Sequence, residues 1–318
     1  MAKIRAYEIK DYSFPFKKKL KLISTTLEKR DGSFLKVLLS DGSSQIAELA
    51  PFPTVHKETL SEARKELKKV MELHLNKDLS ELEDFILNNK LASSVSFCLS
   101  QLVEDKLLSS DPSFIPKNSG LIQLDSVDLD LKDKNSFKIK LGREDFELEY
   151  EKLKDLSTRL PKDTKLRLDP NQSLKLDQMI KIIDLLSVER IEYLEDPFKD
   201  PSTCIELKHL YPNIKIALDE TLWDLPIEDI PSFCDILIIK PTRFYSLHYL
   251  IDYIRKAKRD VILSSCYESA RSLKSYQKIC QKFSLHRDMG FGSYEWIEDL
   301  AYKGFNKNDY QLPENTMF

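Results

Sequence analysis

The chain has 318 residues, with 49 basic and 52 acidic side chains and only seven glycines. This length suits two domains, or one large α/β domain with a smaller appendage. A net charge of −3 with both signs interspersed argues against a nucleic-acid partner, which would call for a one-sided basic surface. About 22 glycines would be average for this length, so glycine-rich phosphate loops cannot be the basis of function.

The sequence also bears on membrane association and on the redox state of its cysteines. The longest stretch without a charge, residues 91–103, falls short of the roughly 20 apolar residues of a spanning helix, so no membrane partner is expected. The charged N-terminus carries no secretory segment. Five cysteines, an odd number without CxxC spacing, favour reduced thiols in the cytoplasm. The sequence specifies no oligomeric state.

The first 90 residues have the pattern of an α+β unit. Segments 33–39 and 44–49 flank Asp41-Gly42, a strong hairpin signal. Charged amphipathic helices are predicted over 57–75 and around 80–87. An antiparallel sheet covered by helices should therefore open the chain.

Strands and helices alternate from residue 137 onward, after a helical stripe within 95–103. Each predicted strand ends in a polar residue, and these residues are 29, 26, 24, 21 and 24 positions apart: Lys140, Asp169, Glu195, Asp219, Lys240 and Ser264. Regular units of about 25 residues, with no glycine fingerprint, favour an eight-stranded (β/α) TIM-type barrel over a doubly wound sheet. We predict a catalytic barrel over 91–299 and an N-terminal α+β capping domain over 1–90, joined by residues 300–318.

Three carboxylates at these strand ends predict a metal site. Asp169, Glu195 and Asp219 end consecutive strands, and barrel enzymes carry their chemistry at this rim. Each could instead cap the helix that follows its strand. Three converging anions would repel one another without a cation, and an all-oxygen set selects a hard ion. Mg²⁺ is the expected cofactor, with Mn²⁺ as an alternative.

Lysines are predicted on both sides of this metal. Lys138 and Lys140 are two residues apart and share a strand face, while Lys240 ends a strand that reads as buried. Crowding by like charge lowers the pKa of a lysine towards the range of a base. Such a site suits removal of a proton from a carbon next to a carboxylate, with the metal holding the enediolate.

At this point the sequence resembles the enolase superfamily, muconate-lactonizing subgroup, for which lysine bases working with magnesium are a documented pattern. The motifs that carry the resemblance occur in order along the chain: Lys138-Ile139-Lys140-Leu141-Gly142, Leu166-Arg167-Leu168-Asp169-Pro170-Asn171, Tyr193-Leu194-Glu195-Asp196-Pro197, Ala217-Leu218-Asp219-Glu220-Thr221 and Ile239-Lys240-Pro241-Thr242. They lie within a region of similarity that covers most of the chain.

The resemblance implies a role for each matched position. Asp169, Glu195 and Asp219 match the magnesium ligands, Lys140 the acid/base, Lys138 its assisting neighbour, and Lys240 the opposite lysine that stabilises the intermediate. Matched substrate-binding positions are Arg167, Asn171, Ser264 and Ser265. The implied reaction is dehydration of a cyclohexadiene carboxylate, a small-molecule dicarboxylate, on the route to menaquinone. The loop carrying residues 17–21 would close over the site.

Other activities remain open. The last barrel segment, residues 289–293, lacks the Asp-x-Asp pair with which dipeptide epimerases of the subgroup hold an amine, and Cys266 and Tyr267 alter the serine-rich strand. N-acylamino acid racemisation and cycloisomerisation would use the same metal and lysines. A non-catalytic scaffold would have lost a catalytic residue, and a Schiff-base lyase would not need three carboxylates.

Overall fold

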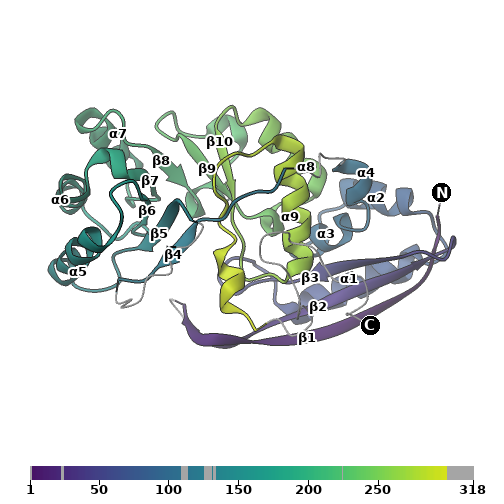
Figure 1. The fold of residues 1–318 in the computed structure, drawn as a ribbon. Coiled ribbons are helices and arrows are strands. Elements are labelled where there is room, and N and C mark those ends of the chain that lie inside the picture. Colours follow the sequence, from purple (N-terminus) through teal and green to yellow (C-terminus); the bar gives the residue numbers. More distant parts are fainter. Residues whose placement is uncertain are drawn as a thin grey trace.

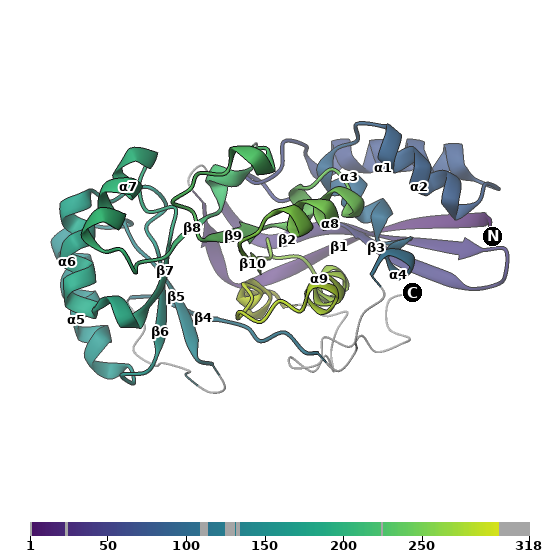
Figure 2. The ribbon, with the colours of Figure 1, turned by 90° about the horizontal axis from the view of Figure 1, so that it is seen from above.

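The computed structural model describes residues 2–22, 25–108, 114–124, 131, 134–223 and 225–298. Within them the chain forms an antiparallel sheet of three strands and a parallel sheet of seven (Figure 1). The parallel sheet curls and carries helices on its outside, and the antiparallel sheet lies beside it (Figure 2). The predicted barrel class with an N-terminal α+β cap is thereby confirmed. Residues 300–318, predicted to join the cap, lie outside the described residues.

The antiparallel sheet has the order β1 (Ile4–Lys21), β2 (Thr26–Leu39) and β3 (Ser44–Leu49). The predicted hairpin is present: Gly42 adopts a φ of +85°, and its amide donates to the carbonyl of Leu39 over 3.0 Å. Helices α1 (Leu60–His74) and α2 (Leu79–Asn88) pack on this sheet, as the periodicity predicts.

The parallel sheet has the spatial order β10-β9-β8-β7-β6-β5-β4. Its strands are β4 (Gly120–Ile122), β5 (Ser136–Lys140), β6 (Lys165–Asp169), β7 (Ile191–Glu195), β8 (Ile216–Leu218), β9 (Ile236–Ile239) and β10 (Asp260–Leu263). Helices α5 (Phe146–Arg159), α6 (Leu176–Leu186), α7 (Pro201–Leu210), α8 (Leu247–Lys256) and α9 (Ala270–Phe283) follow individual strands. Among the described helices, none is long and apolar enough to cross a membrane.

Two residues bridge the edges of the curled sheet. Gly290 forms a parallel bridge with Ser264 after β10, and Met289 forms one with Asn118 before β4. Backbone hydrogen bonds of 2.7 to 3.1 Å support both bridges, including Met289 N to Lys117 O and Ser265 N to Gly290 O. The eighth position of the predicted barrel is therefore filled by a segment too short to count as a strand.

Buried polar contacts join the antiparallel sheet to the barrel. The carboxylate of Glu48 on β3 accepts the backbone amides of Ser269 and Ser272, at the N-terminus of α9, over 2.9 and 3.2 Å. It also accepts the hydroxyl of Tyr12 over 2.5 Å. Helix α3 (Ser93–Ser100) contributes to both hydrophobic cores, with Val95 on the cap side and Phe97 on the barrel side.

A second link between the two sheets runs through His56. Its Nδ1 accepts the amide of Phe52 over 2.9 Å, and its Nε2 lies 3.1 Å from the carbonyl of Thr242. These partners require the neutral ring with the proton on Nε2. Burial lowers the pKa of His56 to about 4, so the folded protein resists its protonation.

This histidine should make stability depend on pH. Between about pH 6.5 and 4 the unfolded chain binds a proton that the folded chain refuses, so stability falls as the pH falls. We expect unfolding to cost about 2 kcal/mol less at pH 5 than at pH 7 through this residue alone. Denaturant titrations of wild type and His56→Gln at both pH values measure the difference. His209→Gln, at an exposed position, should keep the wild-type dependence; an unchanged slope in His56→Gln would refute the assignment.

Candidate active site

The strand ends of the parallel sheet bring the predicted charged residues to one rim. In the registers of β5, β6 and β7, Lys140 lies beside Asp169, and Lys138 beside Arg167. These strands are followed by β8, whose end precedes Asp219, and by β9, whose end precedes Lys240. The parallel arrangement explains the convergence, because the carboxyl ends of all the strands point the same way.

Ion pairs connect these groups directly. The Nζ of Lys138 lies 2.8 Å from Oδ2 of Asp169 and 2.7 Å from Oε1 of Glu195. On the opposite side, the ammonium of Lys240 donates to both carboxylate oxygens of Asp219. Lys140 stands further off, 3.7 Å from Asp169, and its side chain is 41% exposed towards the pocket. It is therefore the most accessible of the three lysines.

Burial and charge shift the pKa values of this cluster in opposite directions. Burial, reinforced by Asp169 and Asp219, raises the pKa of Glu195 to about 8. Lys138 and Lys140 outweigh burial at Asp169 and lower its pKa to about 2. Burial lowers the pKa of Lys140, and the positive charge of Lys138 adds to that effect. The environment of Lys140 thus favours the neutral amine more than that of an ordinary lysine does.

Lys138 and Lys240 respond differently because carboxylates surround them. Burial would lower the pKa of both, but Asp169 and Glu195 raise that of Lys138, and Asp219 raises that of Lys240. Both therefore remain cations at neutral pH.

Within the described ranges, no group of three or more His, Cys, Asp or Glu side chains is arranged to hold a metal ion. Lysine ammonium groups contact all three carboxylates of the cluster.

A pocket of about 820 Å³ opens over this cluster. Its lining includes the three carboxylates, the three lysines and all four predicted substrate-binding residues, Arg167, Asn171, Ser264 and Ser265. Arg167 is buried, and its guanidinium pairs with Glu192 over 2.7 and 3.1 Å. The hydroxyl of Ser265 contacts that of Ser293 at 2.5 Å. Cys266 lines the pocket and is buried, which raises the pKa of its thiol and argues against a role as nucleophile.

Part of the pocket wall comes from the antiparallel-sheet side of the molecule. Phe52 stacks on Tyr267 with ring centroids 5.3 Å apart, and both line the pocket. Arg30, only 2% exposed, donates to the carbonyls of Tyr267, Ala50 and Pro51 over 3.0, 2.5 and 2.9 Å. Arg30 thereby holds the backbone of Tyr267 and of the residues just before Phe52, which positions the two rings. No pattern in the sequence indicates this contact, because its partners lie far apart along the chain.

Glu149 on α5 is a positioning residue that sequence reasoning missed. Its buried carboxylate accepts the amides of Gly142, Arg143 and Glu144 over 2.6, 2.7 and 3.2 Å. It therefore holds the loop that follows Lys140. The only available signal was a glutamate in the first turn of a helix directly after a catalytic strand.

Known proteins match the chain along most of its length. Residues 129–229 match the family model described as enolase C-terminal domain-like, and residues 4–104 match MenC, N-terminal domain. The o-succinylbenzoate synthase of Aliivibrio fischeri (strain MJ11) is 28% identical over 295 residues, which cover 87% of this chain and 86% of that protein. These matches span both the cap and the barrel.

Solved structures share the fold at low identity. The L-Ala-D/L-Glu epimerase of Bacillus subtilis superposes with a TM-score of 0.77 at 14% identity, covering 95% of this chain and 93% of the other. The o-succinylbenzoate synthase of Thermosynechococcus elongatus BP-1, complexed with Mg in its active site, gives 0.71 at 21%, covering 91% and 93%. In both its cap and its barrel the chain is thus similar to the enolase superfamily.

Gly142, in the loop after Lys140, packs closely against the loop after Asp169. Its φ is +70°, and a Cβ at this position would lie 1.6 Å from Oγ of Ser173. Gly42 offers a matched comparison, since its φ is +85° and a Cβ there would meet nothing within 4 Å.

Alanine at these two glycines should therefore have unequal effects. Gly42→Ala adds only left-handed backbone strain, about 1 kcal/mol, whereas Gly142→Ala adds a steric clash and should cost at least twice as much. Thermal unfolding of both variants measures this difference. Adding Ser173→Gly to Gly142→Ala should recover part of the loss; equal losses in the two single variants would contradict the packing described here.

Proposed function

We propose that the chain is an o-succinylbenzoate synthase, a hydro-lyase that dehydrates 2-succinyl-6-hydroxy-2,4-cyclohexadiene-1-carboxylate to 2-succinylbenzoate in menaquinone biosynthesis. One observation carries the proposal: Lys140 is exposed to the pocket and has a lowered pKa, and the cationic Lys240 lies at the end of a strand across the sheet. The curated relative of the same activity supports the choice of substrate. A cytoplasmic location goes with the proposal, in keeping with five buried free thiols.

The donor chemistry of three described residues suits a divalent cation, even though the structure pairs their carboxylates with lysines. Asp169, Glu195 and Asp219 provide only oxygen donors, which hard ions such as Mg²⁺ prefer, with Mn²⁺ as an alternative. Burial, reinforced by the negative charge of Asp169 and Asp219, raises the pKa of Glu195, and such an ion would favour its charged form. We assign these three carboxylates as its ligands. When bound, the ion would supply positive charge to the substrate carboxylate and to the enediolate.

The lysines account for the proton movements. Lys140 as a free amine takes the proton from the ring carbon next to the carboxylate. It then delivers that proton to the departing hydroxyl, so one C–H and one C–O bond break and water leaves. Lys240 remains a cation and stabilises the negative charge that develops on the substrate. Burial lowers the pKa of Lys140, and Lys138, which keeps its charge, adds to that lowering.

The pocket lining suggests the substrate contacts. We assign Ser264 and Ser265 to the succinyl side. Asn171 lies in the loop after Asp169, and its backbone amide donates to the Asp169 carboxylate over 3.2 Å. Arg167 reaches the pocket floor while bound to Glu192, so we assign it to electrostatic support there.

Dipeptide epimerisation is the second candidate, because an epimerase shares the fold. An epimerase must hold the amine of its substrate. The segment that follows helix α9 contributes Gly290, Gly292 and Ser293 to the pocket lining, and none of these side chains is a carboxylate. This composition favours the dehydration. N-acylamino acid racemisation would use the same lysines and is separated by the substrate test below.

Loss of the diene absorbance measures the proposed reaction. We expect turnover with Mg²⁺, abolition by excess EDTA and restoration by added Mg²⁺. Lys140→Ala should lower kcat by about 10²–10⁴, the usual worth of a general acid/base. Lys165→Ala, a matched lysine at the other end of the barrel, should keep wild-type turnover. Full activity of Lys140→Ala, or solvent deuterium exchange into a dipeptide or an N-acylamino acid without dehydration, would overturn the proposal.

The strand residues Lys17–Lys19 generate a separate prediction. Lys19 lines the pocket mouth and pairs with Glu28 over 2.6 Å, and a dianionic substrate should be attracted to this cationic segment. Replacing Lys17, Lys18 and Lys19 with glutamine should raise KM and flatten its dependence on salt, with little change in kcat. Lys29→Gln, on the neighbouring strand and outside the pocket lining, is the control. Unchanged kinetics in the triple variant would eliminate this role.

A further inference from the structure

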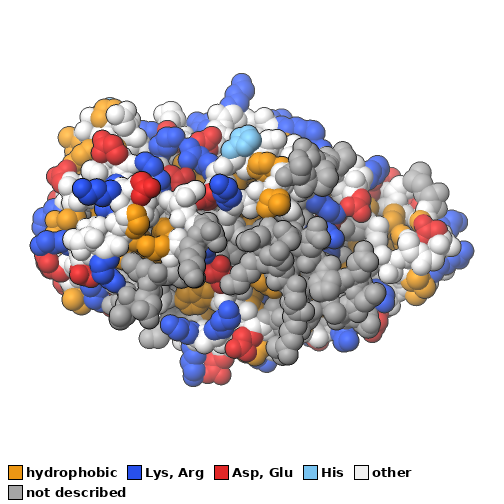
Figure 3. Space-filling model, viewed as in Figure 1, with side chains coloured by type: hydrophobic (Ala, Val, Ile, Leu, Met, Phe, Trp, Pro, Cys, Tyr) orange, Lys and Arg blue, Asp and Glu red, His pale blue; other side chains and the backbone are white. Residues whose placement is uncertain are grey.

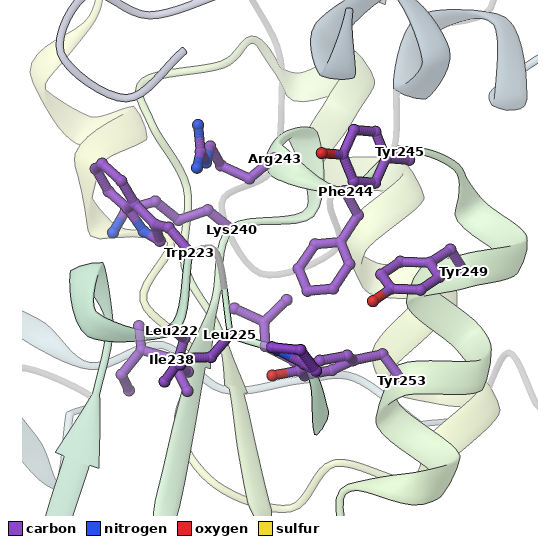
Figure 4. A pocket seen from close by; sticks show the side chains of 12 residues that line it. Leu222, Trp223, Leu225, Ile238, Lys240, Arg243, Phe244, Tyr245, Tyr249 and Tyr253 are labelled. Atoms are coloured by element: carbon purple, nitrogen blue, oxygen red, sulfur yellow. The ribbon is translucent and has the colours of Figure 1, made fainter. Parts of the chain in front are cut away.

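A second cavity, of about 180 Å³, lies between β9, the turn that begins at Pro241 and helix α8. Trp223, Ile238 and Lys240 line both this cavity and the pocket over the carboxylates. The two spaces are therefore neighbours that share a wall. Figure 4 shows the cavity, with Trp223 on one side and aromatic rings from α8 on the other.

Aromatic rings dominate the lining of this cavity. They are Trp223, Phe244, Tyr245, Tyr249 and Tyr253. The Phe244 ring centroid lies 5.2 Å from that of Tyr253, in an edge-on arrangement, and 5.9 Å from that of Tyr249, in a tilted one. Tyr245 and Tyr249 are 52% and 45% exposed, so these rings do not simply fill space in the core. Exposed tyrosines clustered at a cavity mouth are typical of binding sites.

Positive charge occupies one end of the cavity. The guanidinium of Arg243 lies 4.6 Å from the Trp223 ring centroid and donates to the carbonyl of Val55 over 2.7 Å. The ammonium of Lys240 lies 5.4 Å from the same ring, but its charge is paired with Asp219, so Arg243 is the cation on which the recognition of an anion rests. Among the described lining residues both charged side chains are cations. The cavity is thus complementary to a ligand with an anionic end and an aromatic body.

The volume limits the ligand to one ring, because a cavity of about 150 Å³ is known to hold benzene. We propose that this cavity binds a single-ring aromatic carboxylate, with the ring between Trp223 and Phe244 and the carboxylate at Arg243. Binding here is separate from the reaction in the neighbouring pocket and does not depend on which reaction that is. The shared Trp223 and Lys240 give such a ligand direct contact with the wall of that pocket.

Titration with 4-fluorobenzoate, followed by ¹⁹F NMR on the full chain, tests the proposal. A ligand of this size should bind with a Kd on the order of 1 mM. Tyr249→Ala and Arg243→Gln should each raise that Kd at least fivefold, because they remove a ring and the charge. Tyr249 is half-exposed, so its replacement should leave the fold intact, which circular dichroism checks. Cyclohexanecarboxylate and benzyl alcohol, lacking the aromatic ring and the charge respectively, should compete poorly.

A variant in the neighbouring pocket locates the bound ring. Tyr267→Ala alters that pocket and not the cavity, so it should leave the Kd for 4-fluorobenzoate unchanged. A weaker Kd in Tyr267→Ala with no effect of Tyr249→Ala would place the ring over the carboxylates and refute the proposal. Absence of binding at 20-fold the expected Kd, or equal competition by the two control ligands, would refute it as well.

Discussion

Charge compensation in a buried space is the constraint on which the rest of this structure depends. Asp169, Glu195 and Asp219 are nearly excluded from solvent, and buried anions require partners. Lys138 and Lys240 provide them, at the cost of being fixed in place. Lys140 stands further from the carboxylates, and burial lowers its pKa more than the attraction of Asp169 raises it, with the positive charge of Lys138 adding to the lowering. Two of the lysines are thus committed to ion pairs, while the environment of the third favours its neutral amine.

The surrounding structure can be understood as support for this cluster. Strand register fixes the height of each group at the rim, and the two bridging residues Met289 and Gly290 link the sheet edges so that the rim is continuous. Glu149 and Arg30 bind backbone amides and carbonyls, so they shape the loops around the pocket. Such support from outside the site is what keeps catalytic geometry within narrow limits.

The sequence predicted this rim well because strand ends repeat at regular intervals and carry unlike charges. It predicted other parts less well for physical reasons. Helix α9 buries Arg271, Ser272 and Ser275 beside its apolar residues, so its periodicity is masked by polar groups whose partners are distant in sequence. Strand β4 and the bridge at Met289 are too short to show a period. The second cavity is formed by scattered aromatic residues with no motif in common.

The contact between Glu48 and the N-terminus of α9 has a consequence for how the chain assembles. The residues it joins are 221 and 224 positions apart, so the contact closes a very long loop and should form late. During synthesis the hairpin carrying Glu48 leaves the ribosome long before Ser269 and Ser272 are made. The last barrel helix can therefore dock onto a surface that is already built, whereas refolding of the whole chain from denaturant must find the same contact without that order of events.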